Sequence, residues 1–66
     1  MISIEDKDIN ELEFLVVQDY LQKRGTVDAK IYKGNNCIWV ATGTASCPIN
    51  EYFFFREGQL ASIQID

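Results

Sequence analysis

The chain has 66 residues, with 6 basic and 10 acidic side chains, a formal net charge of −4 and no histidine. A chain this short forms one domain and buries only about 60% of its unfolded surface, so its core is thin. The negative charge argues against nonspecific binding to nucleic acid or to an anionic membrane. No apolar run reaches the roughly 18 residues that span a bilayer, and the acidic N-terminus does not resemble a secretory signal. We therefore expect a cytoplasmic protein without membrane association.

Residues 8–24 have the apolar spacing of one helix face, with an apolar side chain at every third or fourth position. These positions are Ile9, Leu12, Val16 and Tyr20. Asp8 and Glu11 have the spacing of a capping box, whereas Ser3 with Asp6 is a second signal for the helix start. The sequence predicts an N-terminal helix whose first turn is undecided.

The same helix carries a second apolar stripe on its other side. Its members are Phe14, Val17 and Leu21, with Leu15 on the flank. At 100° per residue the apolar positions cover more than half of the helix circumference, which is too wide for one flat sheet to cover. Two explanations stay open: a strongly curved sheet surrounds the helix, or part of its surface packs against another chain.

After Gly25 the apolar pattern changes to a period of two, which is typical of strands. Four segments with this pattern are separated by short turn signals such as Gly-Asn-Asn and Arg-Glu-Gly. The segments are residues 26–33, 37–42, 51–55 and 60–66. The sequence therefore predicts an α+β fold, with one N-terminal helix packed on a four-stranded antiparallel meander sheet.

This order of elements resembles the cystatin-like and monellin-like architectures, in which a sheet wraps one helix. The resemblance implies the same layout for residues 1–66. The QxVxG hairpin signature of cystatins is absent from the sequence, so no inhibitory site carries over from that family. A likeness of fold does not by itself assign a function.

The turn between the first two strands decides which side chains face the helix. A two-residue turn at Gly34-Asn35 pairs Ile31 with Ile38 and sends Trp39 to the far side of the sheet. The helix-facing set is then Ala29, Ile31, Ile38 and Val40, and the opposite set is Lys30, Tyr32, Cys37 and Trp39. A three-residue turn through Asn36 would instead bring Trp39 inward, because a one-residue slip reverses the faces. We favour the two-residue turn, and the predicted core comprises Leu12, Val16, Ile31, Ile38 and Ile63.

The third strand segment, residues 51–55, has large side chains on both faces. The fourth segment, residues 60–66, has apolar side chains mainly on one face. Since a single helix shields one sheet face, two of the four aromatic residues at 52–55 must point away from it and lie near Trp39. We expect this apolar face to be covered by a protein partner or by a second copy in a homodimer. The candidate interaction residues are Tyr32, Trp39, Tyr52, Phe53, Phe54 and Phe55.

Cys37 and Cys47 are the only cysteines, and their spacing is not that of a CxxC pair. Without histidine or further cysteine, a zinc site would lack ligands and a cysteine nucleophile would lack its usual base. In the predicted meander they lie about 15 Å apart, beyond the roughly 7 Å between Cα atoms that a disulfide spans. We expect two reduced cysteines that pack as small apolar side chains.

Other patterns for catalysis or ligand binding are weak. The loop at residues 42–48 lacks the lysine and the following helix of a phosphate loop. Glu5, Asp6 and Asp8 lack the alternating oxygen ligands of a calcium loop. No pair of carboxylates converges in the predicted sheet. The sequence therefore predicts no enzyme, no metal and no cofactor.

The leading functional hypothesis is a non-enzymatic protein–protein interaction module that uses the aromatic sheet face, the acidic helix or both. Such a protein would act as a small regulator or inhibitor of a larger protein, a type that phages and other mobile elements encode. A stacking platform for nucleic acid, built on Tyr32 and Trp39 beside Lys30 and Lys33, is a weaker reading, because the net charge opposes it. The alternative is a small-ligand carrier with a cavity between the curved sheet and the helix.

Overall fold

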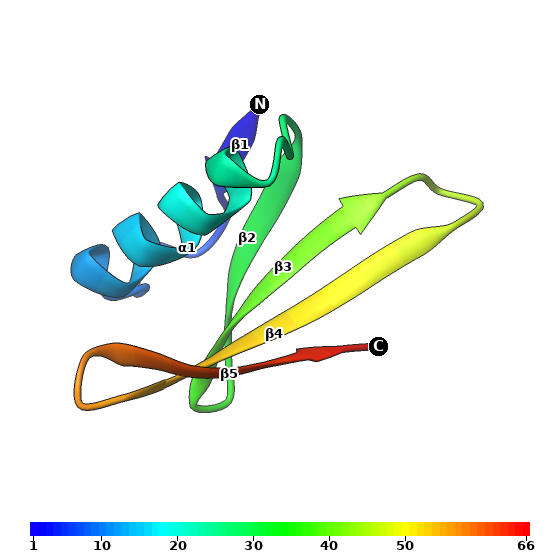
Figure 1. Ribbon diagram of the computed structural model, residues 1–66. Coiled ribbons are helices and arrows are strands. Elements are labelled where there is room, and N and C mark those ends of the chain that lie inside the picture. The colour runs from blue at the N-terminus through cyan, green and yellow to red at the C-terminus, as the bar shows by residue number, and fades with distance from the viewer.

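The computed structural model describes residues 1–66 as one helix on one side of a five-stranded sheet (Figure 1). The elements in chain order are β1 (Ile2–Ile4), α1 (Glu11–Lys23), β2 (Ala29–Gly34), β3 (Cys37–Gly43), β4 (Pro48–Arg56) and β5 (Gln59–Ile65). The predicted α+β class is confirmed. The predicted layout is wrong in two respects: the helix is not the first element, and the sheet has five strands rather than four.

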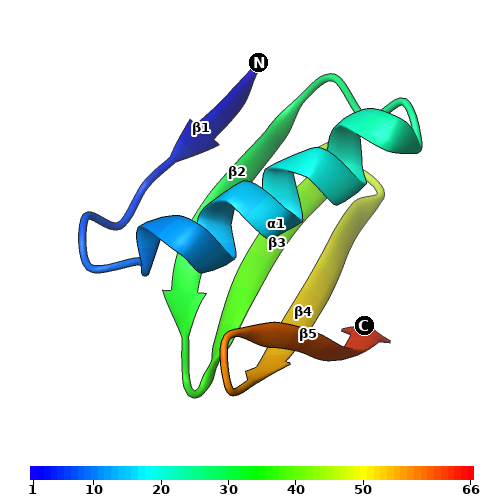
Figure 2. The ribbon, with the colours of Figure 1, turned by 60° about the vertical axis from the view of Figure 1, so that its left-hand side comes forward.

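The unpredicted strand, β1, lies at the sheet edge beside β2 (Figure 2). It runs parallel to β2, with Ile2 opposite Ala29 and Ile4 opposite Ile31, so the sheet is mixed. Strands β2 to β5 form the predicted antiparallel meander in the order β2-β3-β4-β5. Helix α1 is the crossover that a parallel pair requires. A strand of three residues is too short to show an alternating pattern in the sequence.

Helix α1 begins after Asn10 rather than at Asp8. Asn10 has an extended backbone conformation, and its side-chain oxygen accepts a hydrogen bond from the Glu13 N–H at 3.1 Å. This bond satisfies one of the unpaired N–H groups at the helix start. Acidic residues lie in the first turn and a basic residue lies in the last, as the helix dipole favours. Gly25, at φ +89°, ends the helix in the left-handed conformation that glycine adopts easily.

The structure buries the second apolar stripe of α1 instead of the first. Val17 and Leu21 are completely buried, and Phe14 packs against the core. Leu12 is 74% exposed and Val16 is also exposed, so the prediction of these two residues in the core is wrong. Both stripes have helical spacing, and only contacts with the sheet decide which one turns inward.

The turn between β2 and β3 has two residues, Asn35 and Asn36, and places Gly34 opposite Cys37. Asn36 has φ +60°, which suits a tight hairpin turn. Ile31 consequently lies opposite Val40 and not opposite Ile38, two residues away from the predicted pairing. A shift of two residues leaves every side chain on its predicted face.

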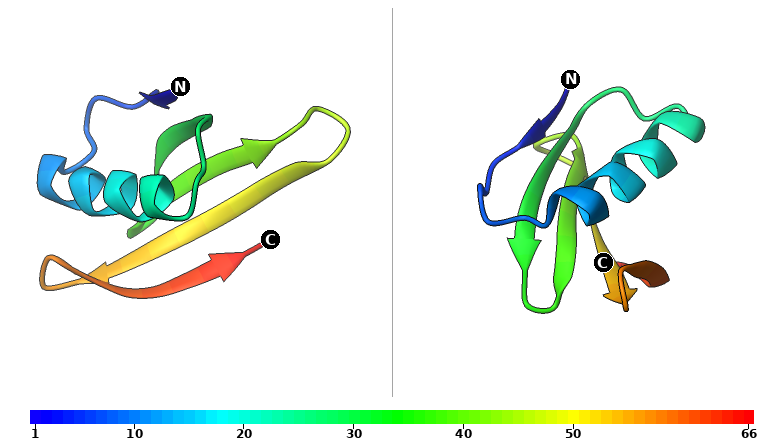
Figure 3. Two further views of the ribbon diagram at one scale, coloured as in Figure 1. Left: turned by 45° about the horizontal axis from the view of Figure 1, so that its top comes forward. Right: turned by 90° about the vertical axis from the view of Figure 1, so that its left-hand side faces the viewer.

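The core lies between α1 and the face of the sheet turned toward it, here called the inner face (Figure 3). The buried apolar residues are Val17, Leu21, Ala29, Ile31, Ile38, Val40 and Phe53. The Phe53 ring meets the Tyr20 ring edge-on, with 5.5 Å between their centroids. A β-bulge between Phe54 and Phe55 changes the register with β5. Of the predicted core residues, Ile31 and Ile38 are buried, and Ile63 packs against the core but is only partly buried.

Candidate protein interaction face

The sheet face turned away from α1, here called the outer face, carries three aromatic rings from three neighbouring strands. Tyr32 of β2 lies opposite Trp39 of β3, and Trp39 lies opposite Tyr52 of β4. The ring centroids are 4.6 Å apart for the first pair and 6.4 Å apart for the second, with ring planes inclined by 31° and 22°. Such aromatic pairs contribute about 0.5–1.5 kcal/mol each beyond the area they bury. We call Tyr32, Trp39 and Tyr52 the aromatic row.

A hydrogen bond orients the central ring of the row. The Trp39 Nε1–H donates to the Asn50 side-chain oxygen at 3.0 Å. All three rings are half-buried, because each ring partly covers its neighbour. A side chain that is already oriented loses little conformational entropy when a partner binds to it.

No other element covers the aromatic row, and Cys37, Ala41 and Phe54 lie beside it on the same face and extend its apolar area. The register places on the outer face, around the row, Ser3, Lys30, Asn50, Ser62 and Gln64. The single helix lies on the opposite side of the sheet (Figure 3). An apolar centre with a polar rim is the usual composition of a protein interface.

The four aromatic residues of β4 divide between the two faces. Tyr52 and Phe54 lie on the outer face, where Phe54 is opposite Cys37. Phe53 is completely buried under α1, and Phe55 packs against the core. Four of the six candidate interaction residues therefore share the outer face, and Phe53 and Phe55 are not part of it.

Glu51 of β4 is the single buried charged residue, with 2% of its surface exposed. It lies on the inner face and accepts hydrogen bonds from both terminal nitrogens of Arg24. Nη1 donates to Oε2 at 2.7 Å, and Nη2 donates to Oε1. The Arg24 guanidinium also lies over the Tyr20 ring, 5.5 Å from its centroid, and its Nε donates to Thr26 at 2.8 Å. The hydrogen bond to Glu51 raises the pKa of Arg24, although desolvation by burial opposes that shift.

This ion pair joins the C-terminal end of α1 to strand β4. Both Glu51 oxygens are occupied by the guanidinium, so neither is free to act as a general base or to bind a ligand. No local pattern in the sequence predicts this pair, because Arg24 and Glu51 are 27 residues apart. One signal was present: Glu51 shares the strand face of the buried Phe53, and a carboxylate there requires a cationic partner.

The two cysteines lie at opposite ends of the β3–β4 hairpin, in agreement with their predicted separation. Cys37, which starts β3, is opposite Phe54, whereas Cys47 directly precedes Pro48 at the other end. Both are free thiols. Burial raises the pKa of Cys37, which lowers its thiolate fraction and hence its reactivity. No group of three His, Cys, Asp or Glu side chains is arranged to hold a metal ion.

Thiol labelling of the native protein is expected to modify Cys47 before Cys37, because Cys47 is exposed while Cys37 is half-buried. Mass spectrometry after timed exposure to iodoacetamide would give the order, and denatured, unreduced protein should carry two labels. The matched variants are Cys47→Ser, which should remove the fast phase, and Cys37→Ser, which should leave it. Faster labelling of Cys37 would contradict its position at the start of β3.

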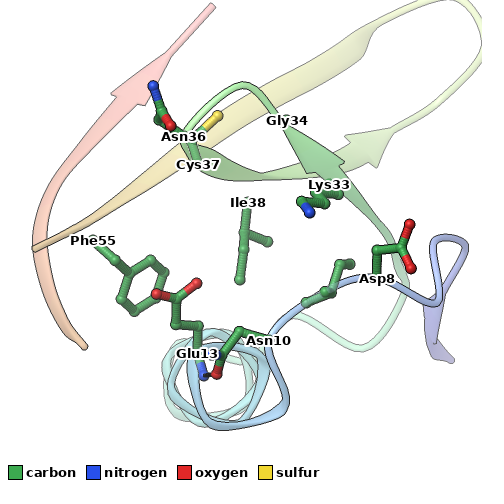
Figure 4. Close-up of a pocket in the computed structure, with 10 residues that line it drawn as sticks. Asp8, Asn10, Glu13, Lys33, Gly34, Asn36, Cys37, Ile38 and Phe55 are labelled. Atoms are coloured by element: carbon green, nitrogen blue, oxygen red, sulfur yellow. Dashed lines mark hydrogen bonds between the residues drawn. The ribbon is translucent and has the colours of Figure 1, made fainter. Parts of the chain in front are cut away.

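The largest hollow, of about 640 Å³, lies between the start of α1 and the β2–β3 turn (Figure 4). Its apolar lining includes Ile9, Ile38 and Phe55, and the polar side chains around it include Asp8, Asn10 and Lys33. These three residues are exposed to solvent, so the hollow is an open polar groove. A small-ligand carrier would require an enclosed apolar cavity, and this groove does not provide one.

Comparisons with family models, with curated proteins and with solved structures gave no match to this chain. The resemblance to cystatin-like and monellin-like architectures therefore rests on element order, from which the parallel strand β1 departs. The single helix, α1, has 13 residues and is neither long nor apolar enough to cross a bilayer.

Proposed function

We propose that this protein is a non-enzymatic interaction module of the cytoplasm, which binds a larger protein through the outer face centred on the aromatic row. The observation that carries this proposal is the ordered row itself. Three large aromatic side chains are kept out of a core that has only seven buried apolar residues. Tyrosine and tryptophan are the residues that most often dominate the binding energy of protein interfaces.

The surroundings of the row favour a protein partner over nucleic acid. Lys30 shares the outer face, but Lys33 has the strand parity of the inner face, so the two cations do not flank the rings together. The backbone N–H of Lys33 donates to the Asp6 carboxylate at 2.7 Å, which places an acidic side chain beside this lysine. The net charge of −4 would also repel phosphates. A small protein with such a face acts by covering a surface of its partner, as a regulator or an inhibitor does.

Replacing Trp39 by lysine is expected to weaken partner binding strongly while the fold persists. The row loses its central ring and the interface gains an unpaired charge, so the affinity should fall by roughly 30-fold or more, which corresponds to about 2 kcal/mol for a hot-spot residue. Affinity capture from the native host with the wild-type protein, followed by mass spectrometry, identifies the partner. Titration of that purified partner against each variant then gives the affinities.

The matched control is Val27→Lys, which adds the same charge at an exposed position between α1 and β2. It should bind as the wild type does. Circular dichroism must show unchanged helix content for both variants. Equal binding by Trp39→Lys and Val27→Lys would refute the proposed face, and unfolding of Trp39→Lys would show that Trp39 stabilises the fold instead.

A further inference from the structure

The two edges of the sheet differ in length and in chemistry. The edge strand β1 has three residues, whereas β5, Gln59–Ile65, has seven. An edge strand presents unpaired N–H and C=O groups that can pair with another extended strand. Proteins usually block such edges with proline or charged side chains, and β5 contains neither. The bulge that distorts β5 lies near its first residues and leaves the rest of the edge regular.

A groove of about 400 Å³ between β5 and α1 runs beside this edge. Leu60 lines it from the strand, the charged residues Asp19, Lys23 and Arg24 form its polar part, and two apolar helix residues, Val16 and Tyr20, form the rest. The two helix residues belong to the apolar stripe that the fold leaves exposed. The flank of α1 near β1 is polar instead, with Gln18 and Gln22. The uncovered apolar surface of the helix therefore extends to the β5 side of the molecule.

We propose that β5 pairs with β5 of a second copy, antiparallel, so that the two five-stranded sheets become continuous across a two-fold axis. Water satisfies the backbone groups of this edge in the single chain, and an extended strand can replace that water along the whole edge. Strand β5 is itself such a strand, with Leu60, Ile63 and Ile65 on the inner face, opposite Phe55, Phe53 and Glu51 of β4. In a pair, these side chains of one copy point toward the exposed helix stripe of the other. Ile65, which is 72% exposed in the single chain, becomes covered.

The charge distribution favours a second copy at this edge. Two chains that each carry a net charge of −4 repel each other overall. Because β5 carries no charged residue, its self-pairing brings no like charges opposite each other. The two-fold axis closes the assembly at a dimer. The aromatic row stays free on the outer face, so this inference goes beyond the proposed function and does not depend on it.

Sedimentation equilibrium of the purified protein, from micromolar to millimolar concentration, tests this pairing. The wild type should show twice the chain mass of 7.6 kDa at the upper concentrations. Ile65→Lys should raise the dimer dissociation constant at least tenfold, since it places two ammonium groups in the paired region. Val27→Lys is the matched control, because Val27 is 75% exposed and lies outside β5; it should dimerise as the wild type does.

A second matched pair tests the groove from the helix side. Val16→Lys should weaken the dimer, whereas Leu15→Lys should not, because Leu15 does not line the groove. This pair also decides the question if Ile65→Lys fails to fold. A wild type that is monomeric at millimolar concentration, or a Val16→Lys variant that dimerises as the wild type does, would overturn the proposal. Loss of the dimer in Trp39→Lys would overturn it too, because the second copy would then bind the aromatic row.

Discussion

Replacing Leu21 by alanine is expected to lower the free energy of unfolding by about 2–5 kcal/mol. Leu21 is completely buried in the core of α1 and the sheet, so truncation removes apolar contacts and leaves a cavity. The total stability of a small domain is about 5–15 kcal/mol, and the loss is a large part of it. Urea denaturation followed by tryptophan fluorescence would measure the change.

The matched control is Leu12→Ala, the same chemical change on the same helix. Leu12 is 74% exposed, so its truncation should change the free energy of unfolding by no more than about 0.5 kcal/mol. Both measurements are made at concentrations where the chain is monomeric, since the exposed stripe that contains Leu12 extends to the groove of the proposed dimer. If Leu12→Ala costs as much as Leu21→Ala, the helix face turned toward the sheet is not the one described here.

Replacing Arg24 by methionine is expected to destabilise the fold by about 2–4 kcal/mol. The substitution leaves the Glu51 carboxylate buried without its cation, which costs about 3–5 kcal/mol in a fully buried pair. The Arg24 side chain is 34% exposed, and solvent screening reduces the expected loss. Because the pKa of Arg24 is raised in the folded state, its charge is present at neutral pH, and the stability that this charge contributes is lost as the pH rises into the strongly alkaline range.

A double-mutant cycle separates the ion pair from simple loss of packing. Adding Glu51→Met to Arg24→Met should recover part of the stability, because the unpaired carboxylate is then gone. Two results would show that Arg24 does not compensate the buried charge: an Arg24→Met variant with the melting temperature of the wild type, or a double variant no more stable than Arg24→Met. Thermal unfolding of the four proteins by circular dichroism gives the cycle.

Two contacts between α1 and β4 explain which face of the helix is buried. Arg24 binds Glu51, and the Tyr20 ring contacts Phe53, so the C-terminal half of α1 is attached to β4 at two points. In this orientation Val17 and Leu21 point into the sheet. The rotation of the helix about its axis therefore depends on residues that are far apart in the sequence.

The sequence by itself determined the features that arise from local patterns. Alternating apolar residues assigned the faces of β2 and β3 correctly, and they tolerated a two-residue error in the pairing of these strands, because side chains on a strand repeat every two residues. In β5 the bulge breaks the alternation, so that Leu60 shares the inner face with Ile63 and Ile65. The surplus of aromatic residues on β3 and β4 predicted the uncovered outer face, although it left open which residues at 52–55 lie there.

Only the tertiary structure decided the features that depend on distant parts of the chain. The strand β1 is defined by its pairing with β2 across the whole helix, and its three residues carry no periodic signal. The two stripes of α1 have the same helical spacing, so periodicity gave no reason to choose between Leu12 and Leu21. The Arg24–Glu51 pair and the groove between α1 and β5 likewise exist only where separate elements meet. Local patterns encode which way a side chain points within its own strand or helix, whereas the packing of those elements decides what it meets.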